Sequence, residues 1–240
     1  MQPLAIIPAR MNSRRVPHKN TKLLAGKPLI AWTIECALRS DVFGHVVVST
    51  DSPVLAEIAR DFGAEIPFLR PSELASDDAT TLSVVQYTVD KLKSDYNYVT
   101  DNIATLQPTS PLRRPHHIQE SVAAFLADAS ADSLVSCCEV SHSLRPDQIM
   151  RLNATGSLES AIADGIVTQH GVRNPLYARN GAAIYITRER HLKSYLLGGR
   201  ILPYFMKPED SIDIDTEFDF RRAEGEMLFR LRGGTGSDPH

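Results

Sequence analysis

Hydrophobic positions along this chain alternate between short continuous runs and longer segments with helical spacing. Residues 4–8 form an apolar run that ends at a proline, and a second run covers residues 45–50. Between them, one helical face carries the apolar residues Leu29, Ile30, Ile34 and Leu38. Ser52 and Pro53 can then begin another helix that extends through Phe62. A strand, a helix, a strand and a helix in this order predict a right-handed parallel sheet.

The same alternation continues toward the carboxyl terminus. Further strands are expected at 103–106, 133–140, 180–187 and 201–206. Further helices are expected at 188–197 and on three apolar stripes: Leu82, Val85, Val89 and Leu92; Ile118, Val122, Phe125 and Leu126; and Phe220, Ala223, Met227, Leu228 and Leu231. The pattern therefore predicts an α/β fold with a mostly parallel sheet and flanking helices.

Two segments do not follow this periodicity. Residues 141–179 contain scattered apolar positions and two prolines, which is typical of a lid or a partner-facing extension, and we expect a dimerisation arm or substrate lid. Residues 233–240 are rich in glycine and polar residues, and we expect a disordered tail. Residues 1–232 are then expected to form one α/β domain that includes the extension.

Composition narrows the class of protein. The chain has 240 residues, of which 42% are hydrophobic, with a formal charge of -3 and an isoelectric point near 6.2. A nucleic-acid-binding protein is usually more basic, and no apolar run approaches the roughly 18–20 residues of a membrane span. The start of the chain lacks the pattern of an export signal, and the three cysteines have neither disulfide nor metal-site spacing. We therefore expect a cytoplasmic protein that binds neither nucleic acid nor membrane.

The most informative polar segment follows the first predicted strand. It carries four cations, Arg10, Arg14, Arg15 and Lys19, and an asparagine, Asn12, that can adopt the positive φ of a tight anion-binding loop. Ligands of open α/β sheets bind at the carboxyl ends of strands, so the segment is a candidate phosphate site, although a solvated basic turn is also compatible. Neither a dinucleotide fingerprint nor a P-loop is present, which argues against a Rossmann dehydrogenase.

Two further segments carry polar side chains close to predicted elements. The string from Gln107 to Arg113 follows a buried strand, and its two prolines can present the Gln107 amide and the Arg113 guanidinium in a rigid cluster. Arg70 lies between two short turns, and residues 77–81 carry acids and hydroxyls ahead of a helix. A proline-rich turn and a set of helix-capping residues are the simpler alternatives for these two segments.

A pair of carboxylates precedes the last predicted helix. Asp213 and Asp215 share one face of an extended backbone, while Ile212 and Ile214 anchor the other face. Two carboxylates at this spacing can bind one Mg²⁺ and leave its other positions to water or phosphate oxygens. Alternatively, Asp215 caps the last helix and Asp213 faces solvent. The pair becomes specific only if it faces the basic loop.

Taken together, these segments resemble the acylneuraminate cytidylyltransferases, the CMP-sialic acid synthetases. The resemblance extends over residues 4–231, and its most specific block is the string Leu106-Gln107-Pro108-Thr109-Ser110-Pro111-Leu112-Arg113. The other matching blocks are Ile7-Pro8-Ala9-Arg10 with Ser13, Lys19-Asn20, Gly26-Lys27-Pro28-Leu29, Ser49-Thr50-Asp51, Arg70-Pro71, Asn180-Gly181-Ala182 and Asp213-Ile214-Asp215.

The resemblance implies a nucleotidyltransferase fold that uses CTP and Mg²⁺ to couple CMP to a nine-carbon keto-sugar acid, an N-acylneuraminate or a related nonulosonate such as legionaminate, with release of pyrophosphate. It also implies a homodimer. The residues expected by this matching are Arg10, Ser13, Arg14, Lys19 and Asn20 for the triphosphate; Arg70, Asp78 and Thr80 for cytosine and ribose; Gln107, Arg173 and Tyr177 for the sugar acid; and Asp213 and Asp215 for the metal. Arg10, Lys19 and the two aspartates are the expected catalytic groups.

One departure from the family pattern leaves alternatives open. Many members read Ala-Arg-Gly-Gly-Ser-Lys in the first loop, whereas this chain has Met11, Asn12 and Arg14 in place of the two glycines and the lysine. Asparagine can imitate the glycine backbone and arginine keeps the charge, although arginine is not equivalent to lysine at a phosphate. A cytidylyltransferase for the eight-carbon 3-deoxy-manno-octulosonate and a nucleotide-binding module without turnover are the alternatives. The Leu-Pro-Gly-Lys segment usual in the eight-carbon enzymes is not found in this chain.

Overall fold

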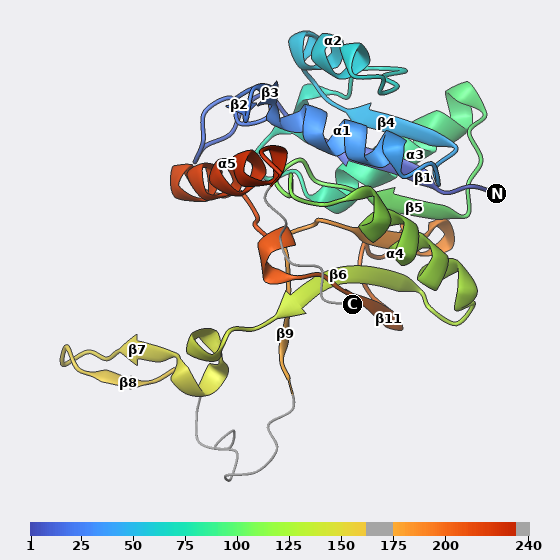
Figure 1. The fold of residues 1–240 in the computed structure, drawn as a ribbon. Helices are drawn as coiled ribbons and strands as arrows, with labels where there is room; N and C mark the ends of the chain where they lie inside the picture. Colours follow the sequence, from blue (N-terminus) through green and yellow to red (C-terminus); the bar gives the residue numbers. More distant parts are fainter. Residues whose placement is uncertain (162–174, 234–240) are drawn as a thin grey trace.

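A seven-stranded sheet forms the centre of the molecule in the computed structural model, which describes residues 1–161 and 175–233 (Figure 1). The strand order is β11-β6-β10-β5-β1-β4, and β9 pairs with β6. The strands are β1 (Leu4–Pro8), β4 (His45–Ser49), β5 (Asn102–Thr105), β6 (Ser133–Glu139), β9 (Tyr177–Arg179), β10 (Tyr185–Arg188) and β11 (Ile201–Phe205). β1 is parallel to β4 and β5, and β6 is parallel to β11, whereas β10 runs antiparallel between β5 and β6. The predicted mostly parallel α/β fold is confirmed.

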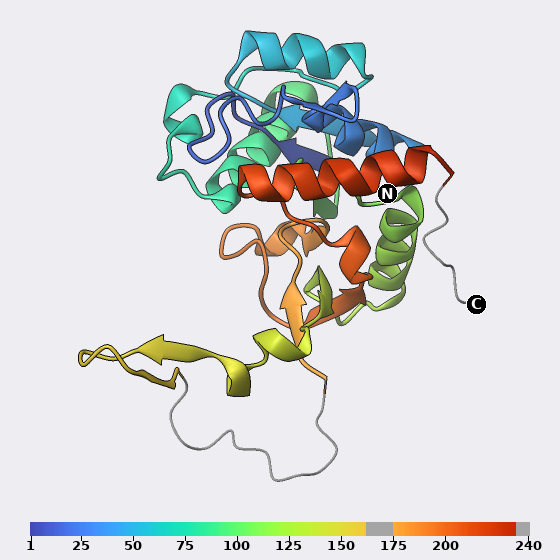
Figure 2. The ribbon, with the colours of Figure 1, turned by 60° about the vertical axis from the view of Figure 1, so that its left-hand side comes forward.

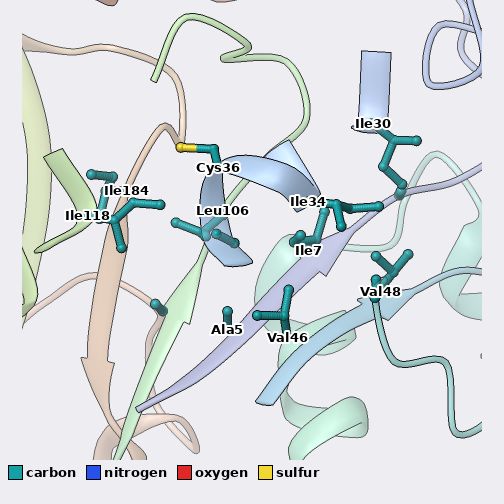
Figure 3. Packing of buried hydrophobic residues seen from close by; sticks show 14 of the residues in the cluster. Ala5, Ile7, Ile30, Ile34, Cys36, Val46, Val48, Leu106, Ile118 and Ile184 are labelled. Carbon is teal, nitrogen blue, oxygen red and sulfur yellow. The ribbon is translucent and has the colours of Figure 1, made fainter. Parts of the chain in front are cut away.

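Helices cover both faces of this sheet. They are α1 (Leu29–Arg39), α2 (Pro53–Asp61), α3 (Thr81–Tyr96), α4 (Pro115–Ala127) and α5 (Glu217–Leu231). Alternate residues of β1 point to opposite faces. Ala5 and Ile7 pack in a core with α1 and α4 (Figure 3). Leu4 and Ile6 pack in another core with α3. A strand buried on both faces explains why its sequence is continuously apolar.

Capping residues fix where the helices begin. The Ser52 hydroxyl accepts from the Leu55 amide at 3.2 Å, as its position before Pro53 predicts. Thr80 caps α3 in the same way. Thr216, and not Asp215, caps α5, in a capping box with Asp219. The interpretation of Asp215 as a helix cap is therefore wrong, and its carboxylate is available for another role.

Several helical faces differ from the predicted stripes. Leu38 and Leu126 are exposed, and so are Leu228 and Leu231 at the end of α5. In α1 the small residues Cys36 and Ala37 are buried instead, and their size lets the helix approach the sheet. A hydrophobic stripe read at exact 3.6-residue spacing includes such edge positions, which the packing then leaves in solvent.

Two other expected elements need correction. Residues 188–197 form a 3₁₀ turn, η4 (Glu189–His191), followed by bends, and not a helix. The turn is held by His191, whose Nε2 lies 2.8 Å from Asp132 Oδ1, and the chain then reverses at Gly198 and Gly199. The strand expected from residue 180 begins only at Tyr185, because the residues before it form a turn.

Residues 141–161 of the segment predicted as an extension lead away from the body of the molecule (Figure 2). Its described part contains two 3₁₀ turns, η2 (His142–Leu144) and η3 (Pro146–Gln148), and a hairpin of β7 (Met150–Leu152) and β8 (Leu158–Ser160) before β9 returns to the sheet. The segment is thus an arm with its own hairpin and is more regular than expected. Arg173 and residues 234–240 lie outside the described residues.

Short elements complete the fold. A two-stranded ribbon of β2 (Leu23–Leu24) and β3 (Lys27–Pro28) precedes α1 and contacts α5. The remaining 3₁₀ turns are η1 (Ser72–Ala75) and η5 (Pro208–Asp210). Within residues 1–161 and 175–233, no helix has the length and apolar content needed to cross a bilayer.

Candidate active site

A cavity of about 600 Å³ opens at the carboxyl ends of β1 and β5. Pro8 ends β1 and Gln107 follows β5, and both line the cavity. Five cations line it as well: Arg10, Arg14, Arg15, Lys19 and Arg70. Ser13 and Asn20 complete the contribution of the first loop. The strand topology therefore brings the basic loop to the edge where α/β sheets bind ligands, and the loop is more than a solvated turn.

Buried contacts hold the first loop in place. Val16 is fully buried, and Asn20 donates through Nδ2 to the carbonyl of Arg10 at 2.8 Å. Positive φ is found at His18 and not at Asn12, because the tight turn forms where the amides of Thr21 and Lys22 both donate to the His18 carbonyl. The expectation for Asn12 is thus wrong, although a positive-φ residue does shape the loop.

Two arginines of the first loop bind one carboxylate. Arg10 Nη1 lies 2.7 Å from Asp77 Oδ1, and Arg14 pairs with Asp77 Oδ2. Hydrogen bonds from both guanidinium groups lower the pKa of Asp77, with the bond from Arg10 the larger influence. The Asp77 carboxylate thus bridges the two cations in the way that a phosphate group could.

The carboxylate pair lies against the same loop. Lys19 Nζ donates to the carbonyl of Ile214 at 2.6 Å, and Arg15 Nη2 lies 2.9 Å from Asp215 Oδ1. Ile214 is fully buried, and its amide donates to the carbonyl of Thr109 at 2.8 Å. Segments about two hundred positions apart in sequence therefore meet at one end of the sheet, which is the arrangement that the sequence analysis required.

Burial shifts the pKa values of two charged groups at this contact. It lowers the pKa of Lys19 from the usual value of a lysine, against the opposing effect of Asp215 and Asp213. Burial likewise raises the pKa of Asp213, a shift that a hydrogen bond from Thr109 opposes. Burial removes the water that would solvate both charged groups, so a bound ligand that makes polar contacts with them would stabilise their charged forms.

Asp213 and Asp215 fit a divalent cation that is coordinated partly by the protein and partly by a bound phosphate. Oδ1 of Asp213 is buried and has no hydrogen-bond partner. The described residues contain no group of three or more histidine, cysteine or acidic side chains that could hold a metal by themselves. Mg²⁺ is commonly bound through one or two carboxylates together with substrate phosphates, so a pair of aspartates beside a cationic cavity suits it.

Arg70 and Gln107 also line the cavity. The Arg70 side chain is almost fully buried, with Nη2 3.7 Å from Asp51 Oδ1, and burial lowers its pKa. Gln107 Nε2 donates to Thr81 Oγ1 at 3.4 Å. Asp78 is exposed and Thr80 caps α3, and the residues between and beside them, Asp77, Ala79 and Thr81, line the cavity instead.

Arg113 does not face the cavity. Its guanidinium is buried and donates to the carbonyl of Ala183 at 2.5 Å and to Thr33 Oγ1 at 2.8 Å. The expectation that Arg113 is presented to a ligand is wrong, because acceptors from distant segments draw it inward. Its role is to tie the loop after β5 to the turn before β10.

Tyr177 is likewise not among the residues that line the cavity, and neither are Asp213 and Asp215, whose segment contacts the first loop beside it. Tyr177 lies on β9 with 47% of its surface exposed, and its ring is 4.4 Å from that of Phe205. The cavity residues that sequence reasoning missed are chiefly Ser76 and Asp77. Identifying Thr80 as the helix cap would have marked them as loop residues free to fold back over Arg10.

Comparison with known proteins agrees with this geometry. The cytidylyltransferase family matches residues 4–220. The chain is 36% identical to CMP-N,N'-diacetyllegionaminic acid synthase of Legionella pneumophila over 95% of this chain and 97% of that protein. It is 37% identical to N-acylneuraminate cytidylyltransferase of Escherichia coli, with 92% of this chain and 51% of that protein covered. The chain therefore spans about half the length of the latter relative.

Solved structures show the same fold. A CMP:2-keto-3-deoxy-manno-octonic acid synthetase complexed with CTP superposes with a TM-score of 0.72 at 18% identity, over 96% of this chain and all of that one. A 4-diphosphocytidyl-2C-methyl-D-erythritol synthase from Anaerococcus prevotii superposes with a TM-score of 0.61 at 8% identity, over 95% of this chain and 99% of that one. The fold, the extent of the family match and the identity to the Legionella protein lead to one conclusion: this chain belongs to the cytidylyltransferase family.

Proposed function

We propose that the protein transfers CMP from CTP to the hydroxyl of a nine-carbon keto-sugar acid, an N-acylneuraminate or a related nonulosonate such as legionaminate, and releases pyrophosphate. The observation that carries this proposal is that the cationic first loop lines a cavity of about 600 Å³ and, through Lys19 and Arg15, also contacts the segment that contains the aspartate pair. The choice of a nonulosonate as acceptor is supported by the relatives named for legionaminic acid and N-acylneuraminate.

The first loop is proposed to bind the triphosphate. Arg10, Ser13, Arg14, Lys19 and Asn20 all line the cavity, and guanidinium, ammonium, hydroxyl and amide groups are suitable donors for phosphate oxygens. Binding would replace the Asp77 carboxylate on Arg10 and Arg14 with phosphate oxygens. No covalent intermediate on the protein is needed, because the loop acts by positioning and by stabilising charge.

The cytosine and ribose are assigned to the wall around Arg70. Arg70 is buried beside Val84 and Thr81, both of which line the cavity. The segment expected to contribute through Asp78 and Thr80 is now proposed to contribute through Ala79 and Thr81.

Asp213 and Asp215 are proposed to hold Mg²⁺, which when bound would neutralise phosphate charge in the transition state. Lys19 keeps this segment in place through the carbonyl of Ile214, which lies between the two carboxylates. The oxygen of the acceptor hydroxyl attacks the α-phosphorus and releases its proton to solvent, while the bond to the pyrophosphate oxygen breaks on the opposite side. Arg10, Arg14 and Lys19 stabilise the negative charge that develops on the departing pyrophosphate.

Gln107 is proposed to contact the sugar acid, since it lines the cavity next to the carboxylate segment. Tyr177 and Arg173 belong to the arm and would act on the sugar acid in a homodimer. The described part of the arm exposes apolar side chains that a partner could cover, namely Leu144, Met150, Leu152 and Leu158. Because its cysteines are free thiols and CTP is an intracellular nucleotide, we propose that the enzyme acts in the cytoplasm.

The experiment that tests this function is an acceptor panel. The purified protein is mixed with CTP and MgCl₂ and with eight- and nine-carbon keto-sugar acids in turn, and pyrophosphate release is measured. We expect release with N-acetylneuraminate or a legionaminate and little with 3-deoxy-manno-octulosonate. Release with the eight-carbon acid alone would establish the alternative enzyme, and release with none would leave a nucleotide-binding module.

A separate measurement tests the arm. Leu152→Glu and Leu158→Glu together place charge on the exposed side of the hairpin, so we expect a dimer to become a monomer in light scattering after size-exclusion chromatography. The control, Leu23→Glu, alters an exposed leucine of β2 in another part of the molecule. A wild-type monomer would refute the dimerisation role.

A further inference from the structure

Gly181 lies against the carboxylate of Asp213. A Cβ atom built on Gly181 would lie 2.6 Å from Asp213 Cγ and 2.8 Å from each of its carboxylate oxygens. Contacts shorter than 3.0 Å are essentially never seen for a real Cβ. The almost equal distances show that the carboxylate presents its face to the glycine. Any side chain at position 181 would force this carboxylate to move.

The turn that contains Gly181 is rigid. Asn180 is 4% exposed, and its side chain accepts from Ser136 Oγ at 2.7 Å and donates to Ser211 Oγ at 3.0 Å. On the other side of the glycine, the carbonyl of Ala182 accepts from the Gln107 amide at 3.0 Å. Gly181 itself has a φ of +69°, in the left-handed region that favours glycine.

The backbone of Asp213 is held just as firmly. Its neighbour Ile214 is fully buried, donates to the Thr109 carbonyl and accepts from Lys19. With the backbone fixed on both sides of the contact, only the side-chain torsions of Asp213 could relieve a collision. Rotation of these torsions would turn the carboxylate away from its present position beside Lys19.

We propose that Gly181 is a positioning residue for metal binding: its missing side chain lets the Asp213 carboxylate keep the one orientation in which it and Asp215 bind a divalent cation together with nucleotide phosphates. The buried Asp213 Oδ1, which has no protein partner, is the atom held ready for the cation. This inference rests on the proposed function. Residues that orient metal ligands commonly affect metal affinity by about 10–100-fold.

The test is Gly181→Ala, with Gly156→Ala as the matched control. Gly156 has a φ of +81° in the hairpin of the arm, and a Cβ there would meet nothing within 4 Å. The control therefore has the same backbone strain without the collision. Binding of Mn²⁺ to the protein–CTP complex is measured from the relaxation rate of water protons, in the absence of sugar acid. A sample that contains Mn²⁺ and CTP without protein serves as the blank. CTP binding in EDTA is measured separately.

We expect Gly181→Ala to weaken Mn²⁺ binding at least about tenfold and to change metal-free CTP affinity less than twofold. Gly156→Ala should change neither. In the Asp213→Asn background, Gly181→Ala should cause no further loss, because its effect passes through that carboxylate. Unchanged Mn²⁺ affinity in the folded single variant, or an equal loss in the Asp213→Asn background, would overturn the proposal.

A second variant covers the case in which Gly181→Ala does not fold. Ser211→Ala removes the oxygen acceptor of the Asn180 side-chain amide, leaves Met206 Sδ as its other acceptor, and so loosens the same turn without adding atoms. It should weaken Mn²⁺ binding severalfold, and unchanged binding would overturn the proposal. The proposed function fails separately, namely if the wild-type protein binds Mn²⁺–CTP but releases pyrophosphate with no acceptor.

Discussion

The two sides of the candidate site differ in how their groups are held. On the first loop, the guanidinium groups of Arg10 and Arg14 share the Asp77 carboxylate, and the Arg14 side chain is 76% exposed. The backbone of the aspartate segment is held from the interior by the buried side chain of Ile214 and by the hydrogen bond from the Ile214 amide to Thr109. The exposed ion pairs can exchange their partners, whereas the buried contacts keep the backbone of the aspartate segment in place.

This difference matches the proposed role of each side. CTP arrives as one molecule and leaves as pyrophosphate and the CMP-sugar, so the cations proposed to bind its phosphates need partners that are easily replaced, as exposed ion pairs are. Catalysis requires the metal-binding groups to keep their geometry within a fraction of an ångström, which needs rigid support. We therefore expect substitutions on the two sides to have different consequences, and the predictions below are ordered by the size of their effect.

The largest effect is expected for Asp215→Ala. Loss of this carboxylate removes charge stabilisation in the transition state, and kcat should fall on the order of a thousandfold while metal-free CTP binding changes little. Steady-state pyrophosphate release and a CTP titration in EDTA measure the two quantities. A near-normal kcat at saturating Mg²⁺ would refute the metal role of the pair.

A substitution at Arg230 is expected to weaken the contacts that hold the aspartate segment. Its Nη1 lies 2.9 Å from Asp210 Oδ1, and Asp210 is buried just ahead of the aspartate segment. Arg230→Met leaves this carboxylate with Arg114, at 3.2 Å, as its remaining arginine partner. We expect the free energy of unfolding to fall by about 3 kcal/mol in urea denaturation.

Arg221→Met is the control for this prediction, because Arg221 is an exposed residue of the same helix. It should change stability by less than about 0.5 kcal/mol. Equal effects of the two variants would show that the Arg230–Asp210 pair does not anchor the segment.

The same cluster predicts a pH dependence of stability. Burial lowers the pKa of His117 to about 3, and its Nδ1 accepts from the Arg114 amide. The unfolded chain binds a proton at this histidine near pH 6.5, but the folded protein does so only near pH 3, so stability is lost as the pH falls through this window. The slope contributed is at most about 1.4 kcal/mol per pH unit, the value for a difference of one bound proton.

His117→Asn should flatten the stability profile between pH 6.5 and 3, whereas His116→Asn, at the exposed neighbour, should leave it as in the wild type. Thermal unfolding at a series of pH values measures both. A parallel profile for His117→Asn would show that the folded protein already carries the proton.

The smallest effect is expected for a substitution of Asp77, which pairs with the arginines of the first loop. Asp77→Asn frees Arg10 and Arg14, so CTP should bind about threefold more tightly, and the gain should shrink with added salt. Asp78→Asn, at the exposed adjacent acid, should have no such effect. Weaker CTP binding by Asp77→Asn would mean that the carboxylate shapes the loop and does not compete with phosphate.

The sequence was sufficient for the parts of this molecule that local patterns determine. Continuous apolar runs identified β1, β4, β5 and β6, and Ser52 identified the start of α2. The meeting of Lys19 with the segment of Asp213 and Asp215 was the condition under which the aspartate pair would be specific, and the structure meets that condition. The strands and the helix start depend on alternation and chain order, which a sequence displays directly.

The features that the sequence could not supply depend on long-range partners. Arg113 turns inward because the Ala183 carbonyl and the Thr33 hydroxyl accept from it, and nothing near Arg113 in sequence indicates this. Asp77 enters the site because its loop folds back onto Arg10. Gly181 reads as an ordinary turn residue until the position of Asp213 is known.

The reversed direction of β10 has an architectural consequence. Tyr185, at the beginning of β10, pairs with Thr105 at the end of β5, so the chain enters β10 at the edge where β5 leaves. A uniformly parallel sheet would deliver the Asn180-Gly181 turn to the far edge. The reversal of this one strand therefore lets a residue that precedes a strand lie against Asp213, which follows the sheet in sequence, at the edge where β1 and β5 end.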